Sequence, residues 1–242
     1  CVLTETIRVD PKRVAITPID PNDTDERSVT GGYVLKFDVP DSSEFSFRTR
    51  RGLPDPPAEV CIAIPKAADM PKAQRDYIQG YIQTFEDALH EDRAEGFRQH
   101  THLDYIDRAS WVDHHLLNVI TENADAFFRS AYMTKDRQGR LVAGPMWDND
   151  RSLGGDERSE TPEQWDGGFG ATELWEFGWW GMLARDPDFV QAWIDRWQSL
   201  RDTEFSLARL LPLVDSMADQ IGAAAAARDA AKWPDNTSRF GG

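Results

Sequence analysis

Acidic residues collect at two places that the local sequence pattern can bring together. Asp125 and Asn123 end an apolar, helix-like run, and the small polar Ser130 follows five residues after Asp125. The second place holds Asp148 and Asp150, directly after a strand-like segment. Paired carboxylates suit a hard divalent cation, because Mg²⁺ is usually held by one or two carboxylates plus water and substrate phosphates. The residue types therefore predict an acidic site for a divalent metal.

A predicted hairpin would join the two places. Strand-like segments 127–133 and 141–146 flank a short turn that contains Asp and Gly. A hairpin places the residue before its first strand beside the residue after its second, so we expect Asp125 and Asp148 to be neighbours. If Asp148 and Asp150 lie on extended backbone, both side chains share one face, roughly 6 to 7 Å apart. In phosphoryl transfer one carboxylate orients the attacking hydroxyl and another holds the metal, and we assign these roles to Asp125 and Asp148.

The same stretch contains an ordered motif that resembles the CotH family of kinase-like proteins. The motif is N-x-D, a Ser or Asn five residues later, a strand with a Tyr, and then G-P-x-W-D-x-D with a Gly after it. The similarity runs through most of the chain. The residues that carry the resemblance are Asn123, Asp125, Ser130, Tyr132, Gly144, Pro145, Trp147, Asp148, Asp150 and Gly154, with Gly31-Gly32-Tyr33, residues 46–52 and Arg196-Trp197 as further points of similarity.

The resemblance implies a role for each of these acids. Asp125 resembles the catalytic-loop Asp of protein kinases, and Asp148 resembles the metal-binding Asp, with Asp150 as a second candidate ligand. Ser130 stands where protein kinases carry a metal-binding Asn, and its hydroxyl is a weaker ligand. The remaining candidates for cofactor binding are Asn123, Arg151 and Glu5. For Arg151, both a phosphate contact and neutralisation of the nearby acids remain open.

The family resemblance also implies cofactors, partners and location. It implies ATP with Mg²⁺ or Mn²⁺, transfer of phosphate to Ser or Thr of a protein substrate that is basic and Ser-rich, and an extracytoplasmic, cell-surface or spore-coat location. The net charge of -15 agrees with a basic substrate. It argues against nucleic acid as a partner, because phosphate backbones select basic surfaces. Many soluble proteins are acidic for solubility alone, so the charge does not decide the matter.

The beginning of the chain bears on nucleotide binding. Leu3-Thr4-Glu5 is similar to a strand that links the two lobes in CotH-like proteins. The family's R-G-N-S-like segment and its nucleotide-binding Lys would precede Cys1, so we expect this chain to lack those N-terminal lobe strands.

The predicted fold class is α+β, with a short strand-rich part followed by a mostly helical, kinase-like lobe. We place the strand-rich part at residues 1–68 and the helical lobe, which carries the acidic site, at residues 69–242. No apolar run approaches the roughly 20 residues of a transmembrane helix. The strands are expected at residues 2–7, 13–17, 33–38, 45–48 and 59–65, and the helices at residues 71–90, 110–123, 173–185, 188–197 and 206–231.

Two other function classes remain open. A secreted glycan-binding module is suggested by the Trp-rich segment 173–185, because exposed tryptophans stack on sugar rings. At helical spacing, however, most of these rings should lie in the core. A pseudokinase or a structural surface or spore-coat protein is suggested by Ser130 in place of Asn.

Two clusters of cationic or titratable residues have competing interpretations. The histidines could bind a metal, but their spacing is not that of a zinc site, and we expect surface or capping roles; they are His100, His102, His114 and His115. The basic cluster could pair with nearby acids or bind phosphate; its members are Arg48, Arg50 and Arg51.

Overall fold

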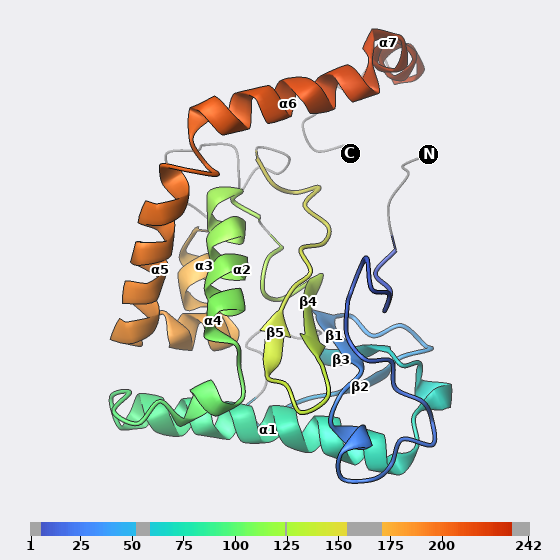
Figure 1. Cartoon of the computed structure of the whole chain (residues 1–242), viewed down its shortest axis with the longest axis vertical. Helices are drawn as coiled ribbons and strands as arrows, with labels where there is room; N and C mark the ends of the chain where they lie inside the picture. Colours follow the sequence, from blue (N-terminus) through green and yellow to red (C-terminus); the bar gives the residue numbers. More distant parts are fainter. Residues whose placement is uncertain (1–5, 52–58, 124, 154–170, 234–242) are drawn as a thin grey trace.

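The computed structural model describes residues 6–51, 59–123, 125–153 and 171–233, which form one antiparallel sheet and seven α-helices (Figure 1). The strands are β1 (Tyr33–Asp38), β2 (Phe45–Phe47), β3 (Glu59–Ile64), β4 (Ala131–Lys135) and β5 (Leu141–Ala143). The helices are α1 (Lys72–Ala94), α2 (Arg108–Ile120), α3 (Ala171–Glu176), α4 (Gly178–Leu183), α5 (Pro187–Arg201), α6 (Leu207–Ile221) and α7 (Ala223–Lys232). The α+β prediction is confirmed.

The sheet has the strand order β2-β3-β1-β4-β5, and every neighbouring pair is antiparallel. Central β1 pairs with β3 on one side and with β4 on the other, which explains why it is buried along most of its length. The β4–β5 hairpin thus belongs to the same sheet as the first three strands. The sheet thus takes strands from both sides of the predicted division at residue 68, and that division stays a prediction.

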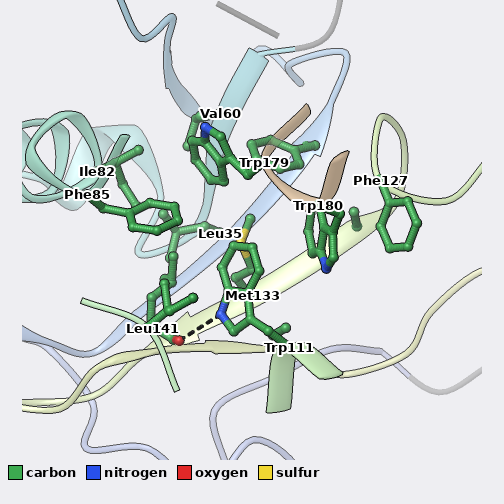
Figure 2. Packing of buried hydrophobic residues seen from close by; sticks show 14 of the residues in the cluster. Leu35, Val60, Ile82, Phe85, Trp111, Phe127, Met133, Leu141, Trp179 and Trp180 are labelled. Carbon is green, nitrogen blue, oxygen red and sulfur yellow. Dashed lines mark hydrogen bonds between the residues drawn. The ribbon is translucent and has the colours of Figure 1, made fainter. Parts of the chain in front are cut away.

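Aromatic rings from the helices cover the sheet and form the centre of the core (Figure 2). The indole rings of Trp111 and Trp180 stack with centroids 4.6 Å apart, and Phe37 of β1 meets Trp179 edge to face at 4.9 Å. Trp111 also donates from Nε1 to the carbonyl oxygen of Leu141 at 3.0 Å. Aromatic pairs of this kind contribute about 0.5 to 1.5 kcal/mol beyond their buried area. This packing fixes α2 against β5.

Helix α2 has a defined start and a defined end. Asp107 is its N-cap and accepts a hydrogen bond from the backbone N–H of Ser110 at 2.8 Å. After Ile120 the chain turns sharply, because Glu122 adopts a left-handed conformation with φ 48°. Asn123 and Asp125 therefore follow directly beyond the C-terminal end of the helix.

Several predicted boundaries are wrong. Segment 127–133 does not begin as a strand, since Phe127 and Ser130 have positive φ and β4 starts only at Ala131. The predicted 13–17 strand is a single bridge between Val9 and Val14, and part of its expected partner, residues 2–7, lies outside the described residues.

Two predicted helices are each divided by a glycine with positive φ. Segment 173–185 is divided into α3 and α4 before Gly178, where φ is 53°. Segment 206–231 is divided into α6 and α7 at Gly222, where φ is 72°. In Figure 1, α6 and α7 lie beyond the end of α5, away from the sheet. No helix in the described part of the chain is long and apolar enough to cross a bilayer.

Candidate functional site

Asn123 connects the two acidic segments. Its side chain is buried, and its Nδ2 donates to the Oδ1 atoms of Asn118 at 3.0 Å and Asn149 at 3.2 Å. Its own Oδ1 accepts from the backbone N–H of Asp125 at 3.3 Å. A buried amide is retained where its hydrogen bonds are satisfied. Asn123 therefore links the end of α2, the Asp125 turn and the loop after β5.

Two further contacts join the same segments. The backbone N–H of Leu153 donates to the carbonyl oxygen of Thr121 at 2.8 Å. Ser130 donates from Oγ to Oδ2 of Asp148 at 3.2 Å. The hairpin thus brings the two predicted places together. Ser130, the residue directly before β4, is the one whose side chain contacts Asp148. The predicted contact between Asp125 and Asp148 stays a prediction.

Arg151 forms an ion pair with Asp125. Its Nε lies 3.5 Å from Oδ2 of Asp125. The expected alternatives for Arg151 were a phosphate contact or neutralisation of Asp148 and Asp150, and the partner found is the candidate catalytic carboxylate. Half of the Arg151 side chain is exposed, so water screens this pair. The guanidinium thus lies beside the candidate catalytic carboxylate and within reach of solvent.

Unusual backbone conformations concentrate around the site. Five of the eight non-glycine residues with positive φ in the described ranges lie in its loops. Two of them are the contacting pair, Ser130 with φ 50° and Asp148 with φ 58°. Positive φ is uncommon outside glycine, and such residues cluster at ligand and active sites. Asp148 is therefore not on extended backbone, so the condition for a common face with Asp150 is not met. The other loop residues with positive φ are Glu122, Phe127 and Leu153.

An aromatic pair and a lysine lie next to the acids. Tyr132 of β4 meets Trp147 edge to face, with ring centroids 6.1 Å apart. Across the sheet Tyr132 pairs in register with Lys36 of β1. Burial raises the pKa of the Tyr132 hydroxyl; Lys36 opposes this shift, and negative charges that include Asp148 add to it. Lys36 Nζ is itself held 3.3 Å from Glu44.

Sequence reasoning missed the residues that hold the site together. Asn118 and Asn149 bind Asn123, and Lys36 lies beside Tyr132. Asn118 could have been noticed, because it is a polar residue among the apolar residues of the predicted helix 110–123. Nothing in the local pattern indicates the other two, because their contacts come from distant strands and loops. Glu5 and Gly154 lie outside the described residues.

The ligand set suits magnesium better than a transition metal. Within residues 6–51, 59–123, 125–153 and 171–233, no group of three or more His, Cys, Asp or Glu side chains converges to hold a metal. The site offers instead a carboxylate at Asp148, the Ser130 hydroxyl and a neighbouring Asp150. Mg²⁺ needs only one or two carboxylates when water and substrate phosphates complete its shell. The residues present therefore fit a metal that arrives with a nucleotide.

The expectation of surface histidines is wrong for three of them, because His102, His114 and His115 are buried. His115 of α2 donates from Nε2 to the carbonyl oxygen of Leu174 at 2.8 Å and accepts from Trp193 Nε1 at 3.1 Å. Burial lowers the pKa of His115 to about 4. This neutral imidazole ties α2 to α3 and α5 and has a structural role.

The tryptophans of the glycan-binding alternative lie in the core. Trp179 and Trp180 are almost fully buried, and Trp175 packs against the same cluster. Trp179 donates from Nε1 to Glu86 Oε1 at 3.1 Å. The buried rings of Trp179 and Trp180 are not available to stack on a sugar.

One of three comparisons with known proteins finds a match. A family model described as CotH kinase protein matches residues 18–240, which is most of the chain. No curated protein and no solved structure matches.

Proposed function

The chain belongs to the CotH kinase family, and from this premise we propose that it transfers phosphate from ATP to a Ser or Thr hydroxyl of a protein substrate, with a divalent metal. The observation that carries the proposal is the junction at Asn123. Hydrogen bonds through its amide hold the Asp125 turn and the Asp148 loop together. The proposal therefore rests on two acids that come from different elements and are held at one end of a hairpin.

Asp125 is the proposed orienting group for the attacking hydroxyl. A carboxylate in this role accepts a hydrogen bond from the hydroxyl and takes up its proton during transfer. Its ion pair with Arg151 restrains the carboxylate. Arg carries five N–H groups in a planar fork that matches phosphate oxygens, so a phosphate contact by Arg151 is part of the proposal.

Asp148 is the proposed metal ligand, with Asp150 and Ser130 beside it. Mg²⁺ or Mn²⁺ held there would neutralise charge on the nucleotide phosphates. The Ser130 hydroxyl already donates to Asp148, and this bond orients the carboxylate in the protein itself. With a metal on Asp148, the hydroxyl could instead turn an oxygen lone pair toward the ion.

The proposed substrate is a basic, Ser-rich protein. The chain carries 42 acidic residues against 27 Lys and Arg. Such a surplus attracts cationic partners at low salt and weakens as salt is added. A cell-surface or spore-coat location is part of the same proposal and rests on family membership.

A structural, non-catalytic role is a second candidate, favoured by one observation. Ser130 stands in place of the Asn that binds a metal in protein kinases, and its hydroxyl is engaged with Asp148. A protein that has lost phosphotransfer could retain this closed arrangement.

Calorimetric titration of ATP with Mg²⁺ into the full-length protein distinguishes the kinase from the structural, non-catalytic role. Asp148→Asn is a suitable variant, because Asn tolerates the left-handed backbone at this position. We expect Asp148→Asn to weaken metal-nucleotide binding at least about tenfold, because the substitution removes one charged ligand. Asp215→Asn, which makes the same charge change on exposed α6, should bind as the parent does. Equal affinity of Asp148→Asn and the parent would contradict the assignment of Asp148.

Transfer itself is tested with a basic Ser-rich peptide and labelled ATP. Asp125→Asn should keep nucleotide binding and lose about 10² to 10⁴ of the transfer rate, the usual contribution of a positioned general base. Nucleotide binding without transfer by the parent protein would favour the structural candidate.

A further inference from the structure

A pocket with charged residues in its wall lies between the C-terminal half of α1 and α4. It is lined by the C-terminal half of α1, by α4 and by Arg51, and encloses about 240 Å³. In Figure 1, α2 rises from the α1 side of the molecule toward the loop that carries Asp125. With 13 residues, α2 is about 20 Å long. The pocket shares no lining residue with the acidic site.

The wall of the pocket contains three arginines and two glutamates. Arg51, Arg93 and Arg185 line it, together with His90. Burial and the nearby Arg51 lower the pKa of His90, while Glu86 opposes the shift. Three guanidinium groups and a titratable imidazole around one cavity are unusual in a chain with a net charge of -15. The three arginines are exposed, and a local cluster of like charge attracts anions from solution.

No described carboxylate lies within ion-pair distance of the three pocket arginines. Arg48 and Arg50 pair with Glu59 and Asp87, at 3.2 and 2.8 Å. By contrast, Arg51 forms no ion pair with any described residue, and the same is true of Arg93 and Arg185. Within the basic cluster, Arg48 and Arg50 therefore pair with acids, whereas Arg51 lines the pocket.

Glu86, the buried acid of the pocket, is occupied by other donors. Its carboxylate accepts from Thr49 Oγ1 at 2.6 Å, Trp179 Nε1 at 3.1 Å and the backbone N–H of Arg51 at 3.1 Å. A fourth bond comes from Gln83 Nε2 at 3.2 Å. These bonds hold Glu86 in the wall and place Arg51 at the rim. The remaining acid, Glu176, is exposed.

We propose that this pocket binds the phosphate group of a phosphomonoester, with Arg51, Arg93 and Arg185 as its ligands. Arg is suited to phosphate because two parallel N–H groups can donate to two oxygens. The cavity exceeds the roughly 30 Å³ share of one water molecule several times, so a phosphate with its ester oxygen and attached carbon fits. Free phosphate and a phosphorylated side chain share this chemistry. The inference is independent of metal-nucleotide chemistry at Asp148.

The test measures binding of two probes without nucleotide or metal. The first is a peptide with one phosphoserine between neutral residues, compared with the same peptide lacking phosphate. The second is inorganic phosphate. Affinities are measured by calorimetry for the parent, Arg93→Gln, Arg185→Gln, Glu176→Gln, Arg209→Gln and Asp148→Asn. Arg209 lies exposed on α6, so its variant removes the same charge at a distance from the pocket.

We expect each pocket arginine variant to bind phosphate about five- to tenfold more weakly. This loss corresponds to the lower end of what a charge-assisted hydrogen bond contributes, because the arginines are exposed. Arg209→Gln should bind as the parent does. Glu176→Gln should bind more tightly, a gain that a structural role for these residues does not predict. Asp148→Asn should retain phosphate binding in full, which separates this pocket from the nucleotide site.

The two sources of phosphate give different outcomes. Tighter binding of the phosphopeptide than of inorganic phosphate assigns the pocket to phosphorylated proteins, and the reverse order assigns it to the free ion. Absence of phosphate binding by the parent overturns the proposal. So does equal binding by the parent and the three pocket variants.

Discussion

Lys135, the last residue of β4, is a charged side chain buried inside the sheet, and its pH dependence can be predicted. The residue is 1% exposed. Its Nζ donates to the carbonyl oxygens of Thr30 at 2.6 Å and Asp136 at 3.1 Å, and lies 4.7 Å from the ring centroid of Tyr81. Burial lowers its pKa from the usual 10.5 to about 8, although the charge of Asp136 opposes the shift. The folded protein therefore releases this proton more readily than the unfolded chain does.

The sign of the effect follows from proton linkage. Between pH 8 and 10.5 the unfolded chain binds more protons at this position, so the free energy of unfolding rises with pH. Below pH 8 the full cost of burying the charge is present, about 3 kcal/mol for a shift of this size. From pH 7 to pH 9.5 the folded protein should recover about 2 kcal/mol of it.

Lys135→Met provides the measurement, because Met has similar length and no charge. Urea unfolding of both proteins at pH 7 and pH 9.5 gives two differences in unfolding free energy. The parent should gain about 2 kcal/mol relative to the variant between these pH values. Cys61 and Tyr33, whose pKa values are raised by burial, act equally in both proteins and cancel. A difference that stays constant with pH would refute a depressed pKa at Lys135.

Three other substitutions test the packing and the site. Trp179→Phe removes the Nε1 hydrogen bond to Glu86 and should lower the unfolding free energy by about 1 to 3 kcal/mol, measured by urea unfolding. The pKa of His115 is near 4, so the stability that it contributes as a neutral group is present above pH 6.5 and lost toward pH 4; His115→Gln should show a smaller fall in Tm over that range. Ser130→Asn introduces the residue that protein kinases carry at the corresponding metal-binding position, and Asn tolerates the φ of 50° found there. It should keep or raise Tm and tighten Mg²⁺-ATP binding, and a lower affinity would argue against Ser130 as a metal neighbour.

The sequence predicts β1 and the hairpin of β4 and β5 because their signals are local. The run at 33–38 is β-branched and aromatic, and it becomes β1 with the predicted bounds. The turn at residues 136–139, which begins with Asp and ends with Gly, indicates a hairpin between two apolar segments. The structure pairs Met133 with Ala143 across it. Turn chemistry and side-chain type are sufficient for both.

The contacts within the site could not be predicted, because they depend on backbone conformations that residue type does not favour. Phe127 and Ser130 are not residues that a sequence pattern would place at positive φ. Because of their conformations, β4 begins only at Ala131, and the side chain that contacts Asp148 is that of Ser130. The bond from Asn123 to Asn149 likewise joins residues far apart in sequence, and only the tertiary packing of α2 brings them together.

The site therefore depends on the register of a hairpin whose turn is fixed at its opposite end by Gly31. A Cβ at Gly31 would lie 2.0 Å from the carbonyl carbon of Asp136 and 2.1 Å from the amide nitrogen of Arg137. Both atoms are backbone, so the turn itself must move. The turn is also held by the N–H of Thr17, which donates to Asp136 Oδ1 at 2.9 Å.

Gly31→Ala should consequently destabilise the protein by about 2 to 4 kcal/mol, as overpacking against backbone does. Because the same hairpin positions Ser130 and Asp148, Mg²⁺-ATP affinity should fall as well, although neither residue is changed. Gly80→Ala is the matched control, since an added Cβ there meets nothing within 4 Å and the position lies inside α1. It should stabilise the protein by up to about 1 kcal/mol through helix propensity and leave affinity unchanged. If Gly31→Ala lowered stability while affinity stayed at the parent value, the acidic site would not depend on hairpin position.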